Sequence, residues 1–114
     1  MASRAYVPDV GDVVWLQFDP QAGHEQAGYR PALVMSSALY NGKSGLMVCC
    51  PLSTKIKGYP FEVLIHLDGQ DSVVLADQVK SLDWKIRRAA KKGSVSDSVV
   101  VAVRARIKAL LLIK

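Results

Sequence analysis

The sequence predicts a single, mainly β domain in which five or six short antiparallel strands form a small barrel or curled sheet, with one C-terminal helix packed on it. Three observations support this prediction. Short β-branched and aromatic runs are separated by segments rich in Gly, Pro and Asn. The hydrophobic period becomes helical only near the C-terminus. The 114 residues, half of them hydrophobic and without repeats or a linker, suit one domain with its own core.

The first half of the chain supplies three of the expected strands. Residues 12–18 (DVVWLQF) are β-branched and aromatic, and the Pro- and Gly-containing segment 19–31 is expected to be a long loop. Two further apolar runs, 32–37 and 46–52, flank the sequence NGKSG at 41–45. Because Asn-Gly is a strong turn signal, these two runs are expected to pair as a hairpin.

The second half is expected to finish the sheet and add the helix. In 61–67 (FEVLIHL) apolar residues alternate with Glu62 and His66, which indicates a strand with one buried face. The turn DGQD (68–71) leads into 72–82, expected to be a strand pair or one bent strand. Behind the N-cap and acidic first turn offered by SDS, apolar residues recur at helical spacing: Val99, Val100, Val103, Ile107, Leu110 and Leu111.

Cysteine usage and hydropathy indicate the compartment. Cys49 and Cys50 are adjacent, and a disulfide between them would strain the peptide that joins them, so two buried thiols in a reducing compartment are expected. No signal-peptide segment is evident, and basic residues interrupt the apolar C-terminal stretch. The protein is therefore expected to be soluble and cytoplasmic, with no membrane partner.

Charge is distributed unevenly along the chain. Residues 1–79 hold five Lys and Arg against eight acids, whereas residues 80–114 hold ten Lys and Arg against two acids. The net charge is +5. A basic last third fits a polyanion or an acidic protein partner, and the alternative is an ordinary solvated face.

Most familiar catalytic signatures are absent from the sequence. There is no Gly-rich phosphate loop before a helix, no pair of His or Cys residues at zinc spacing, and no carboxylate cluster for two metal ions. We therefore expect no metal and no other cofactor.

The loop AGHEQAGYRP (22–31) is the exception. Its glycines allow a bend that brings His24, Glu25, Tyr29 and Arg30 together. RNA cleavage without a metal needs groups that transfer protons and a cation that stabilises the charged phosphorus centre. His and Glu can transfer protons, and Arg can bind a phosphate through two hydrogen bonds. The alternative is that these side chains only cap the loop or pair with one another.

Other polar or aromatic positions allow two interpretations each. Ser53 and Thr54 follow an expected strand, with Lys55 and Lys57 close behind, which suits phosphate contacts or any solvent-facing turn. Trp84 lies beside basic residues and could stack on an unpaired base or anchor the core.

Asp77 interrupts an apolar run. A carboxylate at such a position is either a partnered, half-buried charge or part of a site. The sequence leaves both interpretations open.

Longer segments resemble a known family. GDVVWLQFDPQAGHEQAGYRPALVMS, NGKSGLMVCCPLSTKIKGYPFEV, VVLADQVKSLDWK and AAKKGSV, in this order, are similar to the MazF/PemK family of toxin endoribonucleases from bacterial toxin–antitoxin modules. The resemblance covers the chain from about Tyr6 to the terminal helix. It implies an SH3-like barrel in one toxin domain spanning 1–114, a homodimer, metal-independent and sequence-selective cleavage of single-stranded RNA such as mRNA, and inhibition by an acidic cognate antitoxin.

The resemblance also implies roles for residues of this chain. Arg30 occupies the Arg of the family motif E-Q-x-G-x-R-P and becomes the leading catalytic residue. Glu25 and His24 match the assisting positions. The hydroxyl that is Thr in many members corresponds to Ser53, with Thr54 after it, and serine keeps the hydroxyl.

One family position differs here. Some members carry an Arg two residues before the Asp of a later strand, where this chain has Leu75, while the Asp is present as Asp77. The catalytic work is therefore expected to rest on Arg30, through attack of the 2′-oxygen that leaves a 2′,3′-cyclic phosphate and a 5′-hydroxyl.

Selection of RNA is expected to depend on unpaired bases, which a duplex would hide. The aromatic candidates for stacking are Tyr29, Tyr59, Trp15 and Trp84, although packing is the favoured role for Trp15. The candidates for contacting the RNA backbone are Lys55, Lys57 and Lys80.

Two other function classes compete with this interpretation. A non-catalytic poison of DNA gyrase on a related fold would end in Trp-Gly-Ile, whereas this chain ends in LLLIK. A plain RNA-binding barrel would bind RNA in a salt-dependent way without cutting it. The joint presence of Arg30 and Glu25 argues against the latter.

Overall fold

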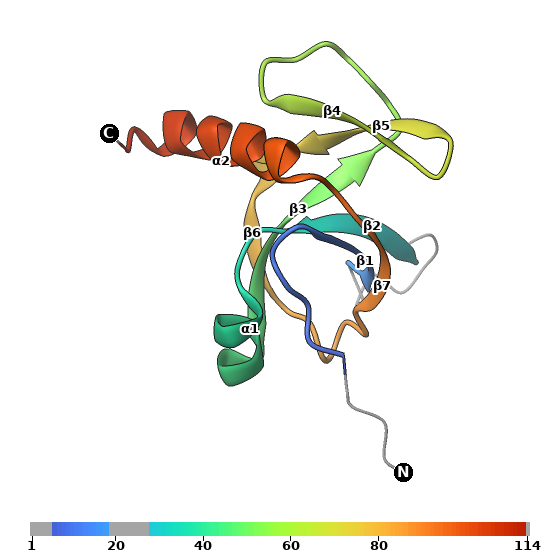
Figure 1. Cartoon of the computed structure of the whole chain (residues 1–114), viewed down its shortest axis with the longest axis vertical. Helices are drawn as coiled ribbons and strands as arrows, with labels where there is room; N and C mark the ends of the chain where they lie inside the picture. Colours follow the sequence, from blue (N-terminus) through green and yellow to red (C-terminus); the bar gives the residue numbers. More distant parts are fainter. Residues whose placement is uncertain (1–5, 19–27, 114) are drawn as a thin grey trace.

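A computed structural model describes residues 6–18 and 28–113. Within them the chain forms seven strands, two α-helices and one 3-10 turn (Figure 1). In chain order these are β1 (Asp12–Gln17), β2 (Tyr29–Val34), α1 (Ala38–Ser44), β3 (Leu46–Ser53), β4 (Glu62–Leu67), β5 (Gln70–Leu75), η1 (Ala76–Gln78), β6 (Lys80–Asp83), β7 (Ala90–Ser94) and α2 (Asp97–Leu111).

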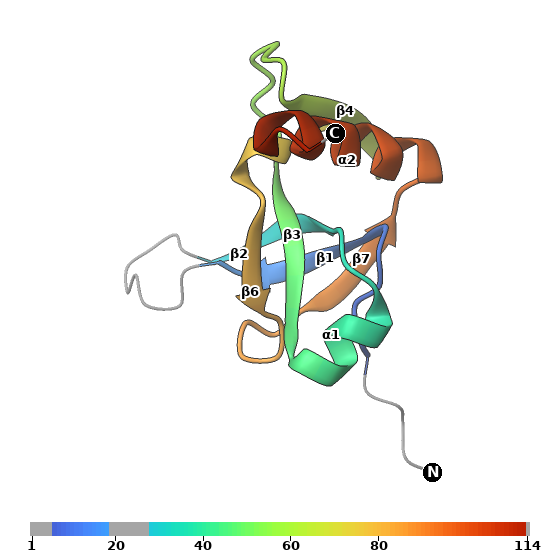
Figure 2. The same ribbon diagram turned by 90° about the vertical axis from the view of Figure 1, so that its left-hand side faces the viewer.

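Strand β3 organises an antiparallel sheet with the order β4-β5-β3-β2-β1-β7. One edge of β3 pairs with β2. The other edge is shared, because β6 pairs with its first half and β5 with its last two residues, Leu52 and Ser53. Figure 2 shows β6 alongside β3, with α2 lying across one end of the curled sheet. The mainly β fold with a C-terminal helix is therefore confirmed.

Two apolar clusters fill the curled sheet. One joins β4, β5 and α2 to the middle of the sheet and is built on residues such as Leu33, Ile65 and Val103. The other lies between β1, β2 and β3 and includes Met47 and Trp84. Strand β3 contributes to both clusters, with Met47 and Cys49 in one and Cys50 and Leu52 in the other. A shift of one residue in the pairing of β3 would move these side chains out of their clusters, so their burial fixes the register of the sheet.

The segment between β2 and β3 differs from the prediction. The two strands pair as expected, but helix α1 joins them where a tight turn was predicted, and NGKSG forms its end. Ser37 caps the helix by accepting the N–H of Tyr40, and Gly45 ends it at φ 77°. Asn41 is fully buried and donates to the carbonyl oxygens of Pro8 and Ser36 at 2.8 and 3.0 Å. These buried hydrogen bonds stabilise a helix that the local sequence alone does not favour.

Segment 72–82 is two strands rather than one bent strand. Strands β5 and β6 both pair with β3 on the same edge, and η1 separates them. The chain leaves the sheet at η1 and returns to it, so the strand-pair alternative is the correct one. This detour places Asp77 and Gln78 beside the end of β3. The strand beyond the expected five or six is β7, which was not predicted from the sequence.

Helix α2 confirms the predicted period only over its first half. Val100 and Val103 are buried, and Asp97 lies in the first turn as expected, but the N-cap Ser96 makes no side-chain capping bond. Leu110 and Leu111 are exposed, so the predicted apolar stripe is not covered to its end. No helix within residues 6–18 and 28–113 has the length and apolar character needed to cross a bilayer.

The predicted burial of the two cysteines is confirmed. Cys49 and Cys50 lie side by side in β3, and both are free and buried. Burial is the main cause that raises the pKa of each thiol to about 12. Since the thiolate is the reactive form, these are packing residues of the core.

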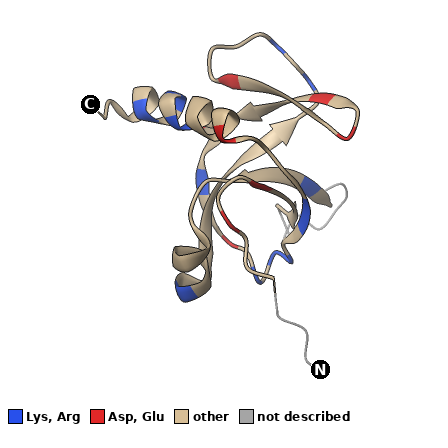
Figure 3. Cartoon of the chain, in the orientation of Figure 1, with Lys and Arg blue, Asp and Glu red and all other residues tan. Residues whose placement is uncertain are grey.

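Most of the described basic residues of the last third lie in two places, and Lys80 lies apart from them on β6. Arg104, Arg106 and Lys108 are on α2, whereas the basic residues at 85–92 lie in β7 and the connection before it. Figure 3 shows that these two groups are well separated. The structure thus divides the basic segment that the sequence predicted as one surface.

Candidate functional site

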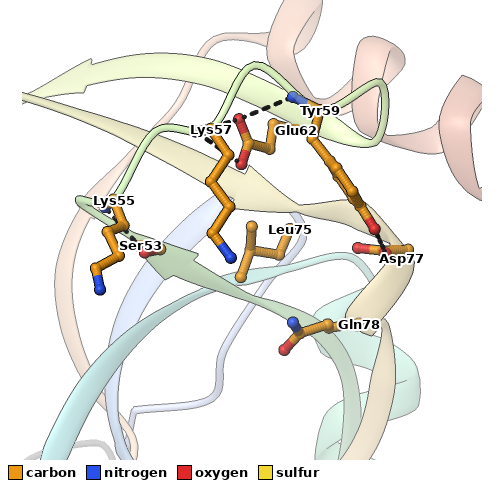
Figure 4. Close-up of a pocket in the computed structure, with 8 residues that line it drawn as sticks. All are labelled: Ser53, Lys55, Lys57, Tyr59, Glu62, Leu75, Asp77 and Gln78. Carbon is orange, nitrogen blue, oxygen red and sulfur yellow. Dashed lines mark hydrogen bonds between the residues drawn. The ribbon is translucent and has the colours of Figure 1, made fainter.

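Two adjoining hollows contain most of the predicted site residues. The first, here the arginine hollow, is lined by Arg30, Pro31, Leu52, Ser53, Thr54 and Ser72. The second, the lysine hollow, is lined by Ser53, Lys55, Lys57, Tyr59, Glu62, Leu75, Asp77 and Gln78 (Figure 4). Ser53 borders both, so we treat the two hollows together as the candidate site.

The arginine hollow is built on paired strands. Arg30 lies in β2 opposite Leu16 of β1, and Ser53 ends β3 opposite Val73 of β5. Both positions are therefore fixed by the backbone pairing of the sheet. Ser53 Oγ accepts the backbone N–H of Lys55 at 3.0 Å, and its hydroxyl hydrogen can still donate toward the hollow.

The lysine hollow is bordered by the loop that joins β3 to β4. Glu62, at the start of β4, accepts the backbone N–H groups of Lys57, Gly58 and Tyr59. Gly58 has φ 77°, a conformation that a side chain would strain. Figure 4 shows the Glu62 carboxylate beneath the loop and the Lys57 side chain extending across the hollow.

The far side of the lysine hollow is closed by a second polar contact. Tyr59 Oη donates to Asp77 Oδ2 at 3.2 Å, which links the loop to η1. This hydrogen bond, together with the charge of Asp77, raises the pKa of the Tyr59 phenol. Asp77 is half-buried and also lines the hollow, so both interpretations that the sequence left open describe it.

Three cations and two carboxylates line the site. Arg30, Lys55 and Lys57 have exposed side chains, whereas the two carboxylates at the lysine hollow already accept hydrogen bonds. Ser53 lies between the arginine and the lysines. Such a set can bind an extended, phosphate-rich chain that passes from one hollow to the other.

Several predicted residues lie elsewhere. Lys80 is exposed on β6, with its Nζ 5.5 Å from the centroid of the Phe18 ring, and lines neither hollow. Tyr29 is half exposed and donates through its hydroxyl to the carbonyl of Arg88 at 3.2 Å. Trp15 is 37% exposed, and Lys92 Nζ lies 5.0 Å from its ring centroid.

The prediction that Trp84 stacks on a base is wrong. The side chain is only 7% exposed, and its Nε1 donates to the backbone carbonyl of Asn41 at 2.9 Å. It therefore anchors α1 to the core, which is the alternative that the sequence allowed. His24 and Glu25 lie outside the described residues.

Sequence reasoning missed Glu62 and Gln78 as parts of the site. Glu62 looked like an ordinary polar residue on the exposed face of a strand, and only the path of the loop turns it toward the loop backbone. The one feature of the sequence that could have indicated this contact is the short spacing between Gly58 and Glu62. Gln78 directly follows Asp77 and could have been included with it. Leu75 lines the lysine hollow, so an apolar wall occupies the place where some members carry an Arg.

Comparison with known proteins identifies the family of this chain. Residues 9–111 match the model of the family described as the PemK-like, MazF-like toxin of type II toxin–antitoxin systems. The chain belongs to this family. The toxin is 50% identical to the endoribonuclease toxin MazF of Escherichia coli K12 over 111 residues, which cover 97% of this chain and 99% of that protein. It is 36% identical to the endoribonuclease toxin ChpB of the same organism, over 89% of this chain and 91% of that one.

Solved structures agree with the family assignment. MazF in a MazE–MazF crystal structure from Deinococcus radiodurans superposes with a TM-score of 0.89 and 51% sequence identity, over 96% of this chain and 100% of that one. A crystal structure of MazF from the same organism gives a TM-score of 0.85 at 52% identity, with the same coverage. The predicted family and its enzyme class, an endoribonuclease toxin, are therefore confirmed.

Proposed function

We propose that this toxin is a metal-independent, sequence-selective endoribonuclease that cleaves single-stranded RNA such as mRNA. The observation that carries the proposal is the position of Ser53, which joins a hollow containing Arg30 to a hollow lined by two lysines. One hollow offers groups for the scissile phosphate, and the other offers cations for the phosphates that follow. A single strand can follow this path, whereas a duplex would hide its bases.

The proposed reaction is a transesterification within the RNA. The 2′-oxygen attacks the neighbouring phosphorus, a new O–P bond forms, and the bond from phosphorus to the 5′-oxygen breaks. The products are a 2′,3′-cyclic phosphate and a 5′-hydroxyl end. One group must take the 2′-hydroxyl proton and another must protonate the departing 5′-oxygen.

Arg30 would act by charge in this mechanism. A guanidinium has a pKa above about 12 and is hard to deprotonate near neutral pH, so we assign it to the phosphate oxygens rather than to proton removal. Its two parallel N–H groups match the oxygens of the charged intermediate, and Ser53 adds a third donor. We assign the proton transfers to Glu25 and His24. Leu75 cannot supply a second positive charge, which leaves this task to Arg30 alone.

RNA recognition would use the rest of the site. Lys55 and Lys57 would contact backbone phosphates, with Thr54 beside them. Tyr59 would stack on a base, and Asp77 would accept hydrogen bonds from base edges. Outside the two hollows, we place Tyr29 and Lys80 on the path of the flanking nucleotides.

We also propose that the toxin acts in the cytoplasm as a homodimer and is inhibited by an acidic cognate antitoxin. One of the similar crystal structures from Deinococcus radiodurans is of MazE–MazF, which supports a protein partner here. The basic residues of α2 and of segment 85–92 suit an acidic chain. Apolar residues remain exposed at the end of α2, which makes this helix a candidate for the dimer interface: Leu110, Leu111, Leu112 and Ile113.

The test is incubation of the purified protein with a long, unstructured RNA in EDTA, with both new ends mapped. Wild type should leave discrete cuts with 5′-hydroxyl ends, and Arg30→Ala should leave the RNA intact. Arg104→Ala is the matched control, because it removes an exposed arginine from α2 rather than from the site. RNA that stays intact with the wild-type protein would contradict the proposal and favour simple binding or a gyrase target.

A further inference from the structure

The loop that carries Lys55 and Lys57 is held mainly by side chains of its neighbours. It begins at Ser53, fixed in β3, and ends at Glu62, the first residue of β4. Near its end, Arg106 of α2 donates to the carbonyl oxygen of Pro60 at 3.1 Å. The segment between these fixed ends contains both lysines of the lysine hollow, and no strand pairing holds it.

Glu62 fills the inside of this loop. Its Oε1 accepts the N–H of Gly58 at 2.9 Å and that of Lys57 at 3.1 Å, and it receives the N–H of Tyr59 at 3.4 Å. Its Oε2 lies 3.2 Å from the same Lys57 nitrogen. One carboxylate thus satisfies three consecutive backbone donors, and the left-handed Gly58 aims them at a single point.

We propose that Glu62 is a positioning residue for RNA binding, which fixes the loop so that Lys55 and Lys57 face the RNA backbone. This inference rests on the proposed ribonuclease function. An acidic residue beside a phosphate-binding surface would ordinarily weaken binding by repulsion. Glu62 has the opposite effect here, because its lone pairs are directed at backbone N–H groups and its removal frees the loop.

The first measurement is the affinity for single-stranded RNA whose 2′-hydroxyl groups are methylated, so that no cutting occurs. Glu62→Ala should raise Kd about threefold to tenfold, because two phosphate contacts lose their fixed geometry. The slope of log K against log salt should fall by about 0.7 to 1.4, as expected for one or two lost phosphate contacts on a single strand. In cleavage of ordinary RNA the change should appear in KM, with kcat nearly unchanged.

Three further variants separate positioning from charge. Glu62→Gln keeps one acceptor oxygen with nearly the same shape, so its Kd should lie between those of wild type and Glu62→Ala. Asp71→Asn removes a negative charge at the other end of the same hairpin, where Asp71 contacts His66, and should leave Kd within about twofold of wild type. In a Lys55→Ala, Lys57→Ala background, Glu62→Ala should have little further effect, because the residues through which it acts are gone.

Amide hydrogen exchange gives a readout that does not depend on RNA. The N–H groups of Lys57, Gly58 and Tyr59 should exchange faster in Glu62→Ala, while those of β3 stay unchanged. If Glu62→Ala does not fold, the nearly isosteric Glu62→Gln carries the same test. Unchanged or tighter RNA binding in both Glu62 variants would overturn the positioning role, since it would show that the carboxylate only repels RNA. Failure of the wild type to cut RNA would instead overturn the proposed function, and failure to bind RNA would overturn both.

Discussion

The arginine hollow and the lysine hollow share Ser53 but differ in what holds their side chains in place. Arg30 and Ser53 lie in paired strands, opposite Leu16 and Val73. Lys55 and Lys57 lie in a loop that rests on the carboxylate of Glu62 and on the contact of Tyr59 with Asp77. The groups proposed to bind the scissile phosphate, which need precise positions, thus lie on paired β-strands. The groups proposed to contact the flexible RNA backbone lie on a loop.

Substitution of Arg30 should have the largest effect on cleavage. Arg30→Lys keeps the charge but loses the planar pair of donors, so kcat should fall by about a hundredfold, with the fold unchanged. Single-turnover cleavage of a short RNA measures this. Near-normal cleavage by the lysine variant would mean that a point charge suffices in the arginine hollow, and the contrast between the two hollows would disappear.

Loss of the Ser53 hydroxyl should have a smaller effect. Ser53→Ala removes one donor to a charged phosphate, which corresponds to a loss of about tenfold in kcat/KM. Ser53→Thr keeps the hydroxyl and should retain most activity. Thr54→Ala removes the neighbouring hydroxyl, which lines only the arginine hollow, and should cause a smaller loss because we assign Thr54 to RNA binding rather than to the scissile phosphate. Equal losses from Ser53→Ala and Thr54→Ala would argue against a special role for the shared residue.

Removal of one loop lysine should affect binding more than chemistry. Lys57→Ala should raise KM about threefold and lower the salt slope by about 0.7, because one phosphate contact is lost. Steady-state kinetics at several salt concentrations provide the measurement. A fall in kcat without a change in KM would assign Lys57 to the reaction itself and would weaken the distinction between chemistry on strands and binding on the loop.

The smallest effect concerns the contact between Tyr59 and Asp77. The hydrogen bond to Asp77 raises the pKa of Tyr59 in the folded protein above its ordinary value of 10.0. The stability that this hydrogen bond contributes to the folded protein is therefore fully present below pH 10. It is lost as the pH rises through the pKa of Tyr59 in the folded state. Asp77→Asn should lower the pKa of Tyr59, as followed by tyrosinate absorbance, and Tyr59→Phe identifies the transition. Identical titration curves for wild type and Asp77→Asn would show that the contact is absent in solution.

Much of the fold followed from the sequence because hydrophobic period and turn residues are local signals. The alternation in 61–67 correctly predicted β4, and the helical spacing after residue 96 correctly predicted α2. Helix α1 was missed because its stability comes from the buried hydrogen bonds of Asn41 and from the indole of Trp84, which lie far apart in the sequence. The same distant contacts explain why Trp84 was open to two interpretations.

For the site, residue types along the chain specified the chemical groups, whereas long-range strand pairing set which of those groups lie together. Arg30, Ser53 and the loop lysines were recognisable from residue type and from resemblance to a family. Their division into two hollows depends on β3 pairing with β5 at one end and with β6 at the other, which places η1 beside Ser53. The role of Glu62 was equally invisible, because a carboxylate becomes a loop anchor only when the folded backbone directs its N–H groups at it.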